Sequence, residues 1–324
     1  MKCLVTGASG FLGGAVARGA AEAGHEVVAI GRAEEAPTGW AGRYRTVNFE
    51  DASALAEVIV EVAPDCVLHF AGSASVADSF RDPAADFACS TALWFRVLDA
   101  VRLSGAAPLV VLASSAAVYG SPAELPTPET APRRPESPYG FHKLLSEQIG
   151  EEYARCFGLA VVSLRFFSVF GPRQRRLLVW EILDQAGSGV PEIRLRGTGE
   201  EQRDFLAEDE AAAVTVAVAE ALAPARSAEF RAINVASGAS VSVLEVAENA
   251  RDCVNPAARI VCGGEALRGN PARWQADIAE LCRLLPQWQP RPFAKSLAKC
   301  AEAWNSAASP ATAASRGPDQ RIFV

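Results

Sequence analysis

Tyr139 and Lys143 are the residues whose types and spacing most directly suggest chemistry. A separation of four residues places both side chains on one face of a helix, and Ser137 and Pro138 before them are typical of an N-cap and a first helical residue. A lysine ammonium close to a phenol favours the phenolate. We therefore expect Lys143 to lower the pKa of Tyr139 toward the range in which its hydroxyl exchanges a proton with a sugar hydroxyl or carbonyl.

Two serines follow an apolar run that we expect to be a strand. Ser114 and Ser115 come directly after Leu109–Ala113. Ligands of an open parallel sheet bind beyond the carboxyl ends of its strands, so either hydroxyl is placed to meet a ligand. By residue type alone, a serine at a strand end is usually a surface or capping group.

A glycine-rich turn opens the chain. The segment TGASGFLG, residues 6–13, follows an expected strand and leads into a helix with regularly spaced apolar residues. Its glycines permit close backbone approach, and the free N–H groups of the helix start attract a pyrophosphate. We predict a dinucleotide site whose contacts include Gly7, Gly10, Phe11, Leu12 and Gly13.

The end of the second expected strand indicates which dinucleotide binds. Glu26–Ile30 is followed by Gly31 and Arg32, where proteins that bind NAD generally carry an acid for the ribose 2′-hydroxyl. A carboxylate would repel a 2′-phosphate, whereas a guanidinium binds it through charge-assisted hydrogen bonds. We expect NADP as the cofactor, with NAD as the alternative.

The order of the expected elements predicts the fold. Short apolar runs alternate with longer helical patterns, which is typical of an α/β fold with a doubly wound, mostly parallel Rossmann sheet. The expected strands are Cys3–Thr6, Glu26–Ile30, Asp65–Phe70, Leu109–Ala113, Ala160–Arg165 and Ala232–Val235. The alternation fades elsewhere, so we predict a dinucleotide-binding domain at 1–170 plus about 206–236, a smaller C-terminal substrate-binding lobe at about 171–205 plus 237–304, and a flexible tail at 305–324.

Composition limits the partners and the compartment. The net charge is −7 without a basic stripe, so we expect no nucleic-acid and no membrane partner. The eight cysteines and three histidines show no metal-ligand spacing, and scattered cysteines are typical of a reducing compartment. No apolar run approaches the ~20 residues of a spanning helix, and no signal peptide precedes the first strand. We expect a cytoplasmic protein without a metal site.

Together these motifs resemble the extended short-chain dehydrogenase/reductases, specifically the nucleotide-sugar epimerase, dehydratase and reductase group. The resemblance runs from Met1 to about Trp304 and rests on TGASGFLG, HFAGSASVADS, LASSAAVYG, SPYGFHK, RFFSVFGP, RDF and NPARWQAD. It implies Tyr139 as general acid/base, Lys143 as the residue that holds the nicotinamide ribose, and a serine that polarises the reacting oxygen. Family members place that serine four residues before the tyrosine of the VYG motif, which is Ser115 here, with Ser114 as the alternative.

The resemblance also implies further contacts to the cofactor and the substrate. Beyond the turn and Lys143, the cofactor contacts are Arg32, Phe49, Ala71 and Phe166, and the substrate contacts are Ser168, Arg203 and Arg268. Two arginines suit a pyrophosphate by charge and geometry, with surface ion pairs as the alternative. Asn48, Ser90, Ser168 and Asn270 replace residue types that are frequent in relatives, so the base and the sugar stay open.

We expect an NADPH-dependent reductase that delivers hydride to the 4-keto carbon of a nucleotide-diphosphate sugar. A C4 epimerase with a retained cofactor is the first alternative, and a non-catalytic dinucleotide-sensing module is the second. A 4,6-dehydratase is disfavoured, because Ala116 and Ala117 stand where sister dehydratases carry carboxylates and an alanine cannot transfer a proton. The resemblance further implies a homodimer.

Overall fold

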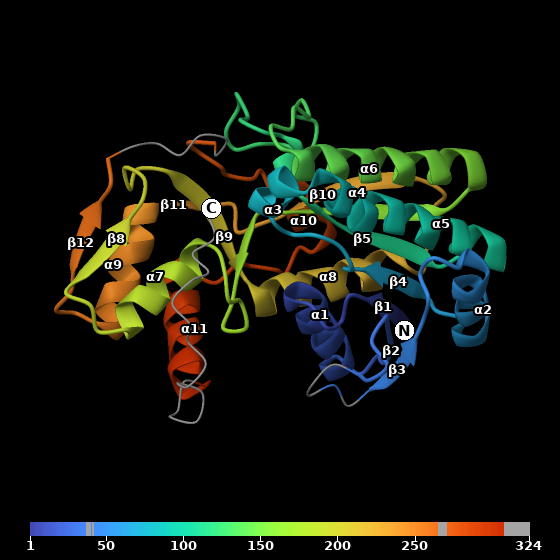
Figure 1. Ribbon diagram of the computed structural model, residues 1–324. Helices are drawn as coiled ribbons and strands as arrows, with labels where there is room; N and C mark the ends of the chain where they lie inside the picture. The colour runs from blue at the N-terminus through green and yellow to red at the C-terminus, as the bar shows by residue number, and fades with distance from the viewer. Residues whose placement is uncertain (37–39, 41, 265–270, 308–324) are drawn as a thin grey trace.

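A large sheet with helices on both faces dominates the computed structural model, which describes residues 1–36, 40, 42–264 and 271–307 (Figure 1). Its seven strands lie in the order β10-β6-β5-β4-β1-β2-β3, and all neighbouring pairs are parallel. The predicted α/β fold with a doubly wound parallel sheet is confirmed.

The strands of this sheet are short and, with one exception, apolar. They are β1 (Lys2–Thr6), β2 (Glu26–Gly31), β3 (Arg43–Thr46), β4 (Cys66–His69), β5 (Leu109–Ser115), β6 (Ala160–Phe166) and β10 (Phe230–Val235). The expected strands all form, with ends that differ by at most two residues. β3 was not predicted, because its sequence RYRT is polar and the strand lies at the exposed edge of the sheet.

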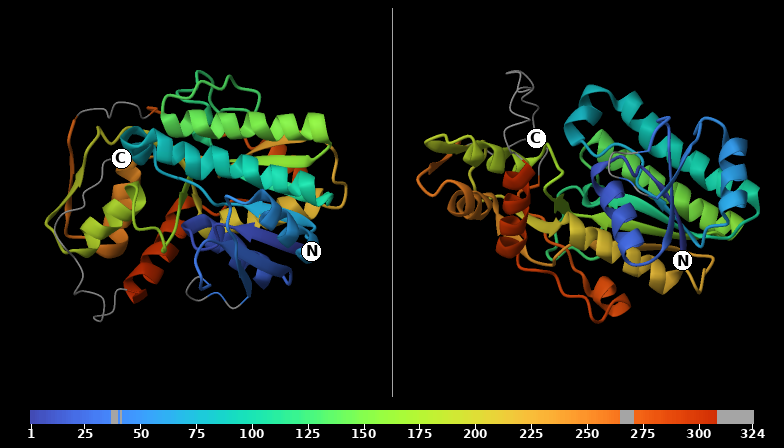
Figure 2. Two further views of the ribbon diagram at one scale, coloured as in Figure 1. Left: turned by 45° about the vertical axis from the view of Figure 1, so that its right-hand side comes forward. Right: turned by 90° about the horizontal axis from the view of Figure 1, so that it is seen from below.

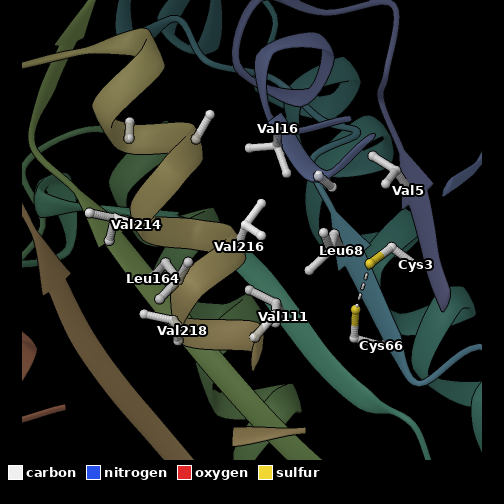
Figure 3. Packing of buried hydrophobic residues seen from close by; sticks show 14 of the residues in the cluster. Cys3, Val5, Val16, Cys66, Leu68, Val111, Leu164, Val214, Val216 and Val218 are labelled. Carbon is white, nitrogen blue, oxygen red and sulfur yellow. Dashed lines mark hydrogen bonds between the residues drawn. The ribbon is translucent and has the colours of Figure 1, made fainter. Parts of the chain in front are cut away.

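Alternate residues of the strands face two separate cores. Cys3, Val5 and Val111 pack with helices α1 (Phe11–Glu22) and α8 (Glu208–Leu222), as Figure 3 shows for Val16 and Val214 of these helices. The residues between them pack with α2 (Ala52–Val62), α5 (Leu93–Ser104) and α6 (Pro138–Phe157) on the other face. Burial on both faces explains why the strands are nearly continuous apolar runs.

A second group of elements has its own core around Phe170, Phe205 and Val246. It contains a three-stranded sheet ordered β11-β9-β7 and a parallel pair, β12-β8 (Figure 2). The elements are β7 (Ser168–Phe170), α7 (Leu178–Gly187), β8 (Glu192–Leu195), β9 (Gln202–Ala207), β11 (Ser240–Ser242), α9 (Val243–Val254), β12 (Arg259–Cys262) and α11 (Phe293–Ala307).

The predicted domain bounds stay a prediction, and two details of the chain bear on them. Helix α10 (Ala279–Leu284) falls within the predicted lobe at 237–304, yet its Leu281 packs into the core of the large sheet. Helix α11 continues to Ala307, past the expected start of the tail at 305. The rest of the predicted tail, 308–324, lies outside the described residues.

Candidate active site

The carboxyl ends of the parallel strands share one edge of the large sheet, and the predicted cofactor residues follow these ends. The glycine-rich turn follows β1, Arg32 follows β2, Ala71 follows β4, and Ser115 and Phe166 end β5 and β6. β1 lies between β2 and β4, so the chain winds outward from it in both directions. Such a switch point is where open α/β sheets bind their ligands.

The turn after β1 has room for backbone but not for side chains. Gly7 has a φ of +74°, and a Cβ atom there would lie 2.5 Å from the backbone nitrogen of Ala71. A Cβ atom on Gly13 would lie 2.3 Å from the carbonyl oxygen of Gly7. Among the described residues no side chain caps α1 at Gly10, so the first-turn N–H groups are available to an anion. These features fit the pyrophosphate of a dinucleotide.

A buried histidine fixes the loop that leaves β4. Nδ1 of His69 lies 2.9 Å from the hydroxyl oxygen of Thr6, and that oxygen accepts a hydrogen bond of 3.2 Å from the backbone of Ala71. Burial and the positive charge of Lys143 lower the pKa of His69 to about 3, so its ring is neutral at neutral pH. His69 therefore positions the turn and Ala71 and is not a proton donor.

The structure distinguishes the two serines at the end of β5. The hydroxyl of Ser114 donates a hydrogen bond of 2.8 Å to the buried carboxylate of Glu147, on the side of the sheet that α6 covers. The hydroxyl of Ser115 accepts a hydrogen bond of 3.2 Å from the backbone of Ala117, and its proximity to the Tyr139 phenol lowers the pKa of Tyr139 against the larger effect of burial. Ser115 is therefore the serine that lies beside the phenol.

Tyr139 and Lys143 project from the first turns of α6. The hydroxyl of Ser137 accepts a hydrogen bond of 3.1 Å from the backbone of Gly140, and Pro138 is the first helical residue, so the expected helix start is confirmed. Lys143 Nζ lies 5.6 Å from the centroid of the Tyr139 ring and donates a hydrogen bond of 2.8 Å to the carbonyl oxygen of Ala113. Burial lowers the pKa of Lys143 to about 8.

The expected lowering of the Tyr139 pKa is not found. Burial raises the pKa of Tyr139 to about 12, with Asp86 acting in the same direction, while Ser115 and Arg176 partly offset the increase. The Lys143 ammonium lies near the ring and is bound to the Ala113 carbonyl, and no hydrogen bond among the described residues joins it to the phenol. The Tyr139 hydroxyl therefore carries its proton at neutral pH in this structure.

The remaining predicted cofactor residues differ in their placement. Ala71 and the buried Phe166 lie at the carboxyl edge, where the ring of Phe166 is 6.0 Å from that of Phe70. Arg32 is exposed and forms no ion pair with any residue that the structure describes. Phe49 follows β3, but its side chain is buried in the core under α2, which is a position for packing rather than for ligand contact.

The predicted substrate residues Ser168 and Arg203 lie on neighbouring strands. Ser168 of β7 pairs with Phe205 of β9, two residues from Arg203. The Arg203 guanidinium lies 5.6 Å from the centroid of the Trp274 ring, and burial lowers its pKa. It forms no ion pair within the described ranges, so the surface ion-pair alternative does not hold for it. Arg268 and Asn270 lie outside the described residues.

Two residues near Tyr139, Asp86 and His142, were not predicted as part of the site. Asp86 and Arg176 both act electrostatically on the phenol. Asp86 also binds His142, which helical spacing alone had placed facing away from Tyr139. Arg176 belongs to the basic run Arg173–Arg176, for which the sequence leaves open a contact to the anionic ligand or a solvated loop. Asp86 is a single acid in an ordinary helical segment, and only the tertiary fold brings it to the site.

Two further properties concern the described part of the chain. None of its helices combines the length and the hydropathy that crossing a bilayer requires. Its histidines, cysteines and acids form no group of three that could hold a metal ion. Ala116 and Ala117, in the short 3₁₀ turn after Ser115, are buried and offer no proton-transferring group there.

Known proteins share both the sequence pattern and the fold. The family described as "NAD dependent epimerase/dehydratase family" matches residues 3–236. A UDP-glucose 4-epimerase of Streptomyces lividans is 31% identical over 311 residues, covering 86% of this chain and 93% of the relative. One of Mycolicibacterium smegmatis is 30% identical over 256 residues, covering 76% and 80%. The structure of a UDP-glucose-4-epimerase from Stenotrophomonas maltophila with bound NAD and formylated UDP-arabinopyranose has a TM-score of 0.85 and 25% identity, covering 95% of this chain and 99% of that one.

Proposed function

The chain belongs to the NAD dependent epimerase/dehydratase family, and on that premise we propose that it is a C4 epimerase of a nucleotide-diphosphate sugar. The observation that carries the proposal is the meeting of Ser115, Tyr139 and Lys143 at the carboxyl edge of the sheet, next to a turn shaped for a dinucleotide. The similarity to two UDP-glucose 4-epimerases supports epimerisation over other reactions of the family. Because Ser115, Tyr139 and Lys143 lie together as proton transfer requires, they also argue against a non-catalytic binding module.

Each of the three residues has a distinct task in this proposal. The bound dinucleotide supplies the acceptor and the donor of the hydride. As the phenolate, Tyr139 takes the proton of the C4 hydroxyl and returns it after the keto sugar has rotated in the site, and Ser115 donates a hydrogen bond to the same oxygen. Lys143 holds the nicotinamide ribose and adds positive charge near the phenol, whose pKa burial raises to about 12.

Arg203 is the cation that we propose to bind the diphosphate of the nucleotide sugar. Arg203 is partly buried, lies against Trp274 and has no described ion-pair partner. An unpaired, pre-positioned guanidinium suits the two negative charges of a pyrophosphate, which it binds through parallel hydrogen bonds. Arg268 and Ser168 complete the proposed substrate contacts.

A second candidate is the NADPH-dependent reductase of a 4-keto sugar nucleotide, and two observations favour it. Arg32 stands exposed and without a described ion-pair partner where NAD-binding proteins generally carry an acid, so it is free to bind a 2′-phosphate. Tyr139 is protonated at neutral pH, which is the state a reductase needs to protonate the forming oxyanion. NADP is therefore the proposed cofactor of this second reading, and NAD that of the epimerase.

One experiment separates the two candidates. The purified chain is incubated with UDP-glucose or UDP-galactose without added cofactor, and in parallel with NADPH and a panel of 4-keto sugar nucleotides. An epimerase interconverts the first pair with no net change in absorbance of the reduced cofactor. A reductase leaves that pair unchanged and oxidises one NADPH per keto sugar. Inactivity in both arms would contradict C4 chemistry on these sugars.

We also propose that the enzyme is a homodimer and works in the cytoplasm. Helices α4 (Pro83–Phe87) and α5 both pack beside α6 (Figure 1). These helices expose large apolar side chains, namely Phe87 on α4, Phe95 on α5, and Phe141 and Leu145 on α6. Phe87 and Phe95 also line an open hollow with Ile149. An apolar patch of this kind on adjacent helices suits a two-fold contact with a second copy. All eight cysteines are free, which supports a reducing compartment.

A further inference from the structure

A buried acid and a histidine form a pair directly beside the proposed proton-transfer residues. Asp86 lies on α4, and His142 lies on α6 between Tyr139 and Lys143. Nδ1 of His142 is 2.5 Å from Oδ2 of Asp86, and the Asp86 side chain is only 2% exposed. Oδ1 of Asp86 is also buried and has no hydrogen-bond partner among the described residues.

The surroundings hold both the backbone and the ring of His142 in place. The carbonyl oxygen of His142 accepts hydrogen bonds from the hydroxyls of Thr91, at 3.0 Å, and Ser146, at 2.8 Å. The ring of Phe87 meets the imidazole edge-on, with centroids 5.4 Å apart. A residue so fixed gives Asp86 a stationary hydrogen-bond partner, although half of the carboxylate remains unpaired. Burying an unpaired carboxylate oxygen costs stability, so this arrangement calls for a compensating role.

The charge of Asp86 acts on both proton-transfer residues. Burial lowers the pKa of Lys143, and Asp86 is the strongest of the charges that raise it again, followed by Cys89 and Glu147. Asp86 also raises the pKa of Tyr139, against Ser115 and Arg176. Glu147 is occupied by Arg165, at 2.7 Å, and on the neighbouring α3 (Val76–Arg81) Asp78 and Arg81 pair with each other at 2.8 Å. Within the described residues, Asp86 is therefore a buried acid that no arginine or lysine pairs with and whose negative charge acts on Lys143.

We propose that Asp86 and His142 form a positioning pair that keeps the Lys143 ammonium charged beside Tyr139, with Asp86 as the counter-charge and His142 as the residue that holds the carboxylate in place. The inference rests on the proposed function, because it concerns the lysine that binds the ribose in that reaction. Its consequence is that the site stays competent to a higher pH than a buried lysine alone would allow.

The charge of Lys143 can be followed without any substrate. The chain contains four lysines, Lys2, Lys143, Lys295 and Lys299, so NMR of protein labelled with ¹³C at the lysine ε-carbons gives few signals. Lys143→Arg assigns the signal of the buried lysine. In the full-length Asp86→Asn variant the titration midpoint of Lys143 should fall by about one pH unit or more, because a buried negative charge that raises the pKa of Lys143 has been removed.

Control variants separate this effect from a general loss of charge or of folding. Asp82→Asn removes a charge from the exposed N-cap of α4 but can keep the cap, and it should leave the Lys143 midpoint unchanged. Asp86→Ser removes the same charge as Asp86→Asn with a smaller side chain, and serves if the asparagine variant does not fold. An unchanged midpoint in folded Asp86→Asn or Asp86→Ser protein overturns the proposal.

Two substitutions test whether His142 contributes to keeping Lys143 charged. His142→Leu leaves Asp86 without a donor and should lower the Lys143 midpoint, because an unpaired buried carboxylate takes up a proton or turns away. His142→Gln supplies a donor again and should restore the midpoint. Equal midpoints in these two variants would remove His142 from the proposal.

Activity provides the second readout. If the chain turns over its sugar nucleotide, the whole profile of kcat/KM against pH should move to lower pH in Asp86→Asn, because Asp86 raises the pKa of both Lys143 and Tyr139. A merely structural role would lower kcat/KM without moving the profile, and that result contradicts the proposal. If no sugar nucleotide is turned over, the proposed function fails while the NMR titration still decides the inference.

Discussion

Ser114 and Ser115 are adjacent in β5, yet their hydroxyls serve different structures. The first belongs to a buried network in which Glu147 also accepts hydrogen bonds from Ser163 and Arg165. The second lies beside Tyr139 at the end of the strand. Side chains alternate along a strand, so a shift of one residue moves a hydroxyl from the packing of α6 to the ligand side of the sheet.

This difference predicts opposite outcomes for two alanine variants. Ser115→Ala should lower kcat by about 10²- to 10³-fold, because the reacting oxygen loses a hydrogen bond. Ser114→Ala should keep kcat and lower the free energy of unfolding by about 1–3 kcal/mol, because the buried Glu147 carboxylate loses a donor. Steady-state kinetics and denaturant unfolding measure both. A loss of kcat confined to Ser114→Ala would exchange the two assignments.

Arg32 decides the choice of dinucleotide in the second candidate function. Arg32→Ser should weaken binding of NADPH by about 10- to 100-fold and leave NADH unaffected, because a charge-assisted hydrogen bond to the 2′-phosphate is worth roughly 1.5–3 kcal/mol. Arg43→Ser is the matched control, since Arg43 is exposed nearby on β3 but is paired with Glu26 at 3.3 Å. Calorimetric titration of the parent and both variants measures the affinities for NADPH and NADH. Equal losses for NADPH and NADH would rule out a contact to the 2′-phosphate.

At the scale of elements, the turn between β1 and α1 is the part of the site most constrained by packing. A Cβ atom at Gly13 meets the backbone of Gly7, which has no flexible end that could move aside, whereas one at Gly19 of the same helix meets only Ala212, at 3.6 Å. A side chain therefore clashes with rigid backbone at Gly13 but fits at Gly19, although both glycines lie in α1.

Gly13→Ala should destabilise the fold by about 1–3 kcal/mol and abolish retention of the dinucleotide, because the turn must shift away from the first-turn N–H groups. Gly19→Ala should be neutral or stabilise by about 0.5–1 kcal/mol, as alanine does in a helix interior. Thermal unfolding and the absorbance of co-purified cofactor report the two effects. Normal cofactor retention in Gly13→Ala would contradict this account of the turn.

The sequence predicted those elements whose signals are local. Continuous apolar runs marked the buried strands, and the Ser137–Pro138 pair marked the start of α6, so both were found. β3 escaped because an edge strand does not need apolar residues. The burial that raises the pKa of Tyr139 and the pairing of Asp86 with His142 arise only when distant segments meet, and no spacing rule in a single sequence reports them.

At the scale of the whole molecule, helices α5 and α6 present an apolar surface that a second copy covers in the proposed homodimer. Phe141 is 53% and Leu145 is 41% exposed on α6, and these helices lie side by side on the outside of the molecule (Figure 1). A specific two-fold contact buries on the order of 800 Å² per partner, which adjacent helices can supply.

The double variant Phe141→Asp, Leu145→Asp should convert a dimer into a monomer, because charges in the centre of an apolar contact are left unpaired. Light scattering coupled to gel filtration should give 34.2 kDa for the variant and about twice that for the parent. The control is Leu244→Asp, because Leu244 is an exposed residue of α9, which belongs to the second group of elements. This variant should stay dimeric. A monomeric parent would contradict the homodimer.

The position of β10 has a consequence for how the chain is made. Its partner β6 ends at Phe166, but β10 begins only at Phe230, after the chain has passed through β7, β8 and β9. At synthesis rates of roughly 5 to 20 residues per second, β6 waits on the order of 3 to 13 seconds as an open sheet edge on the ribosome. Unpaired edges invite wrong partners, so during this interval β6 is exposed to mispairing.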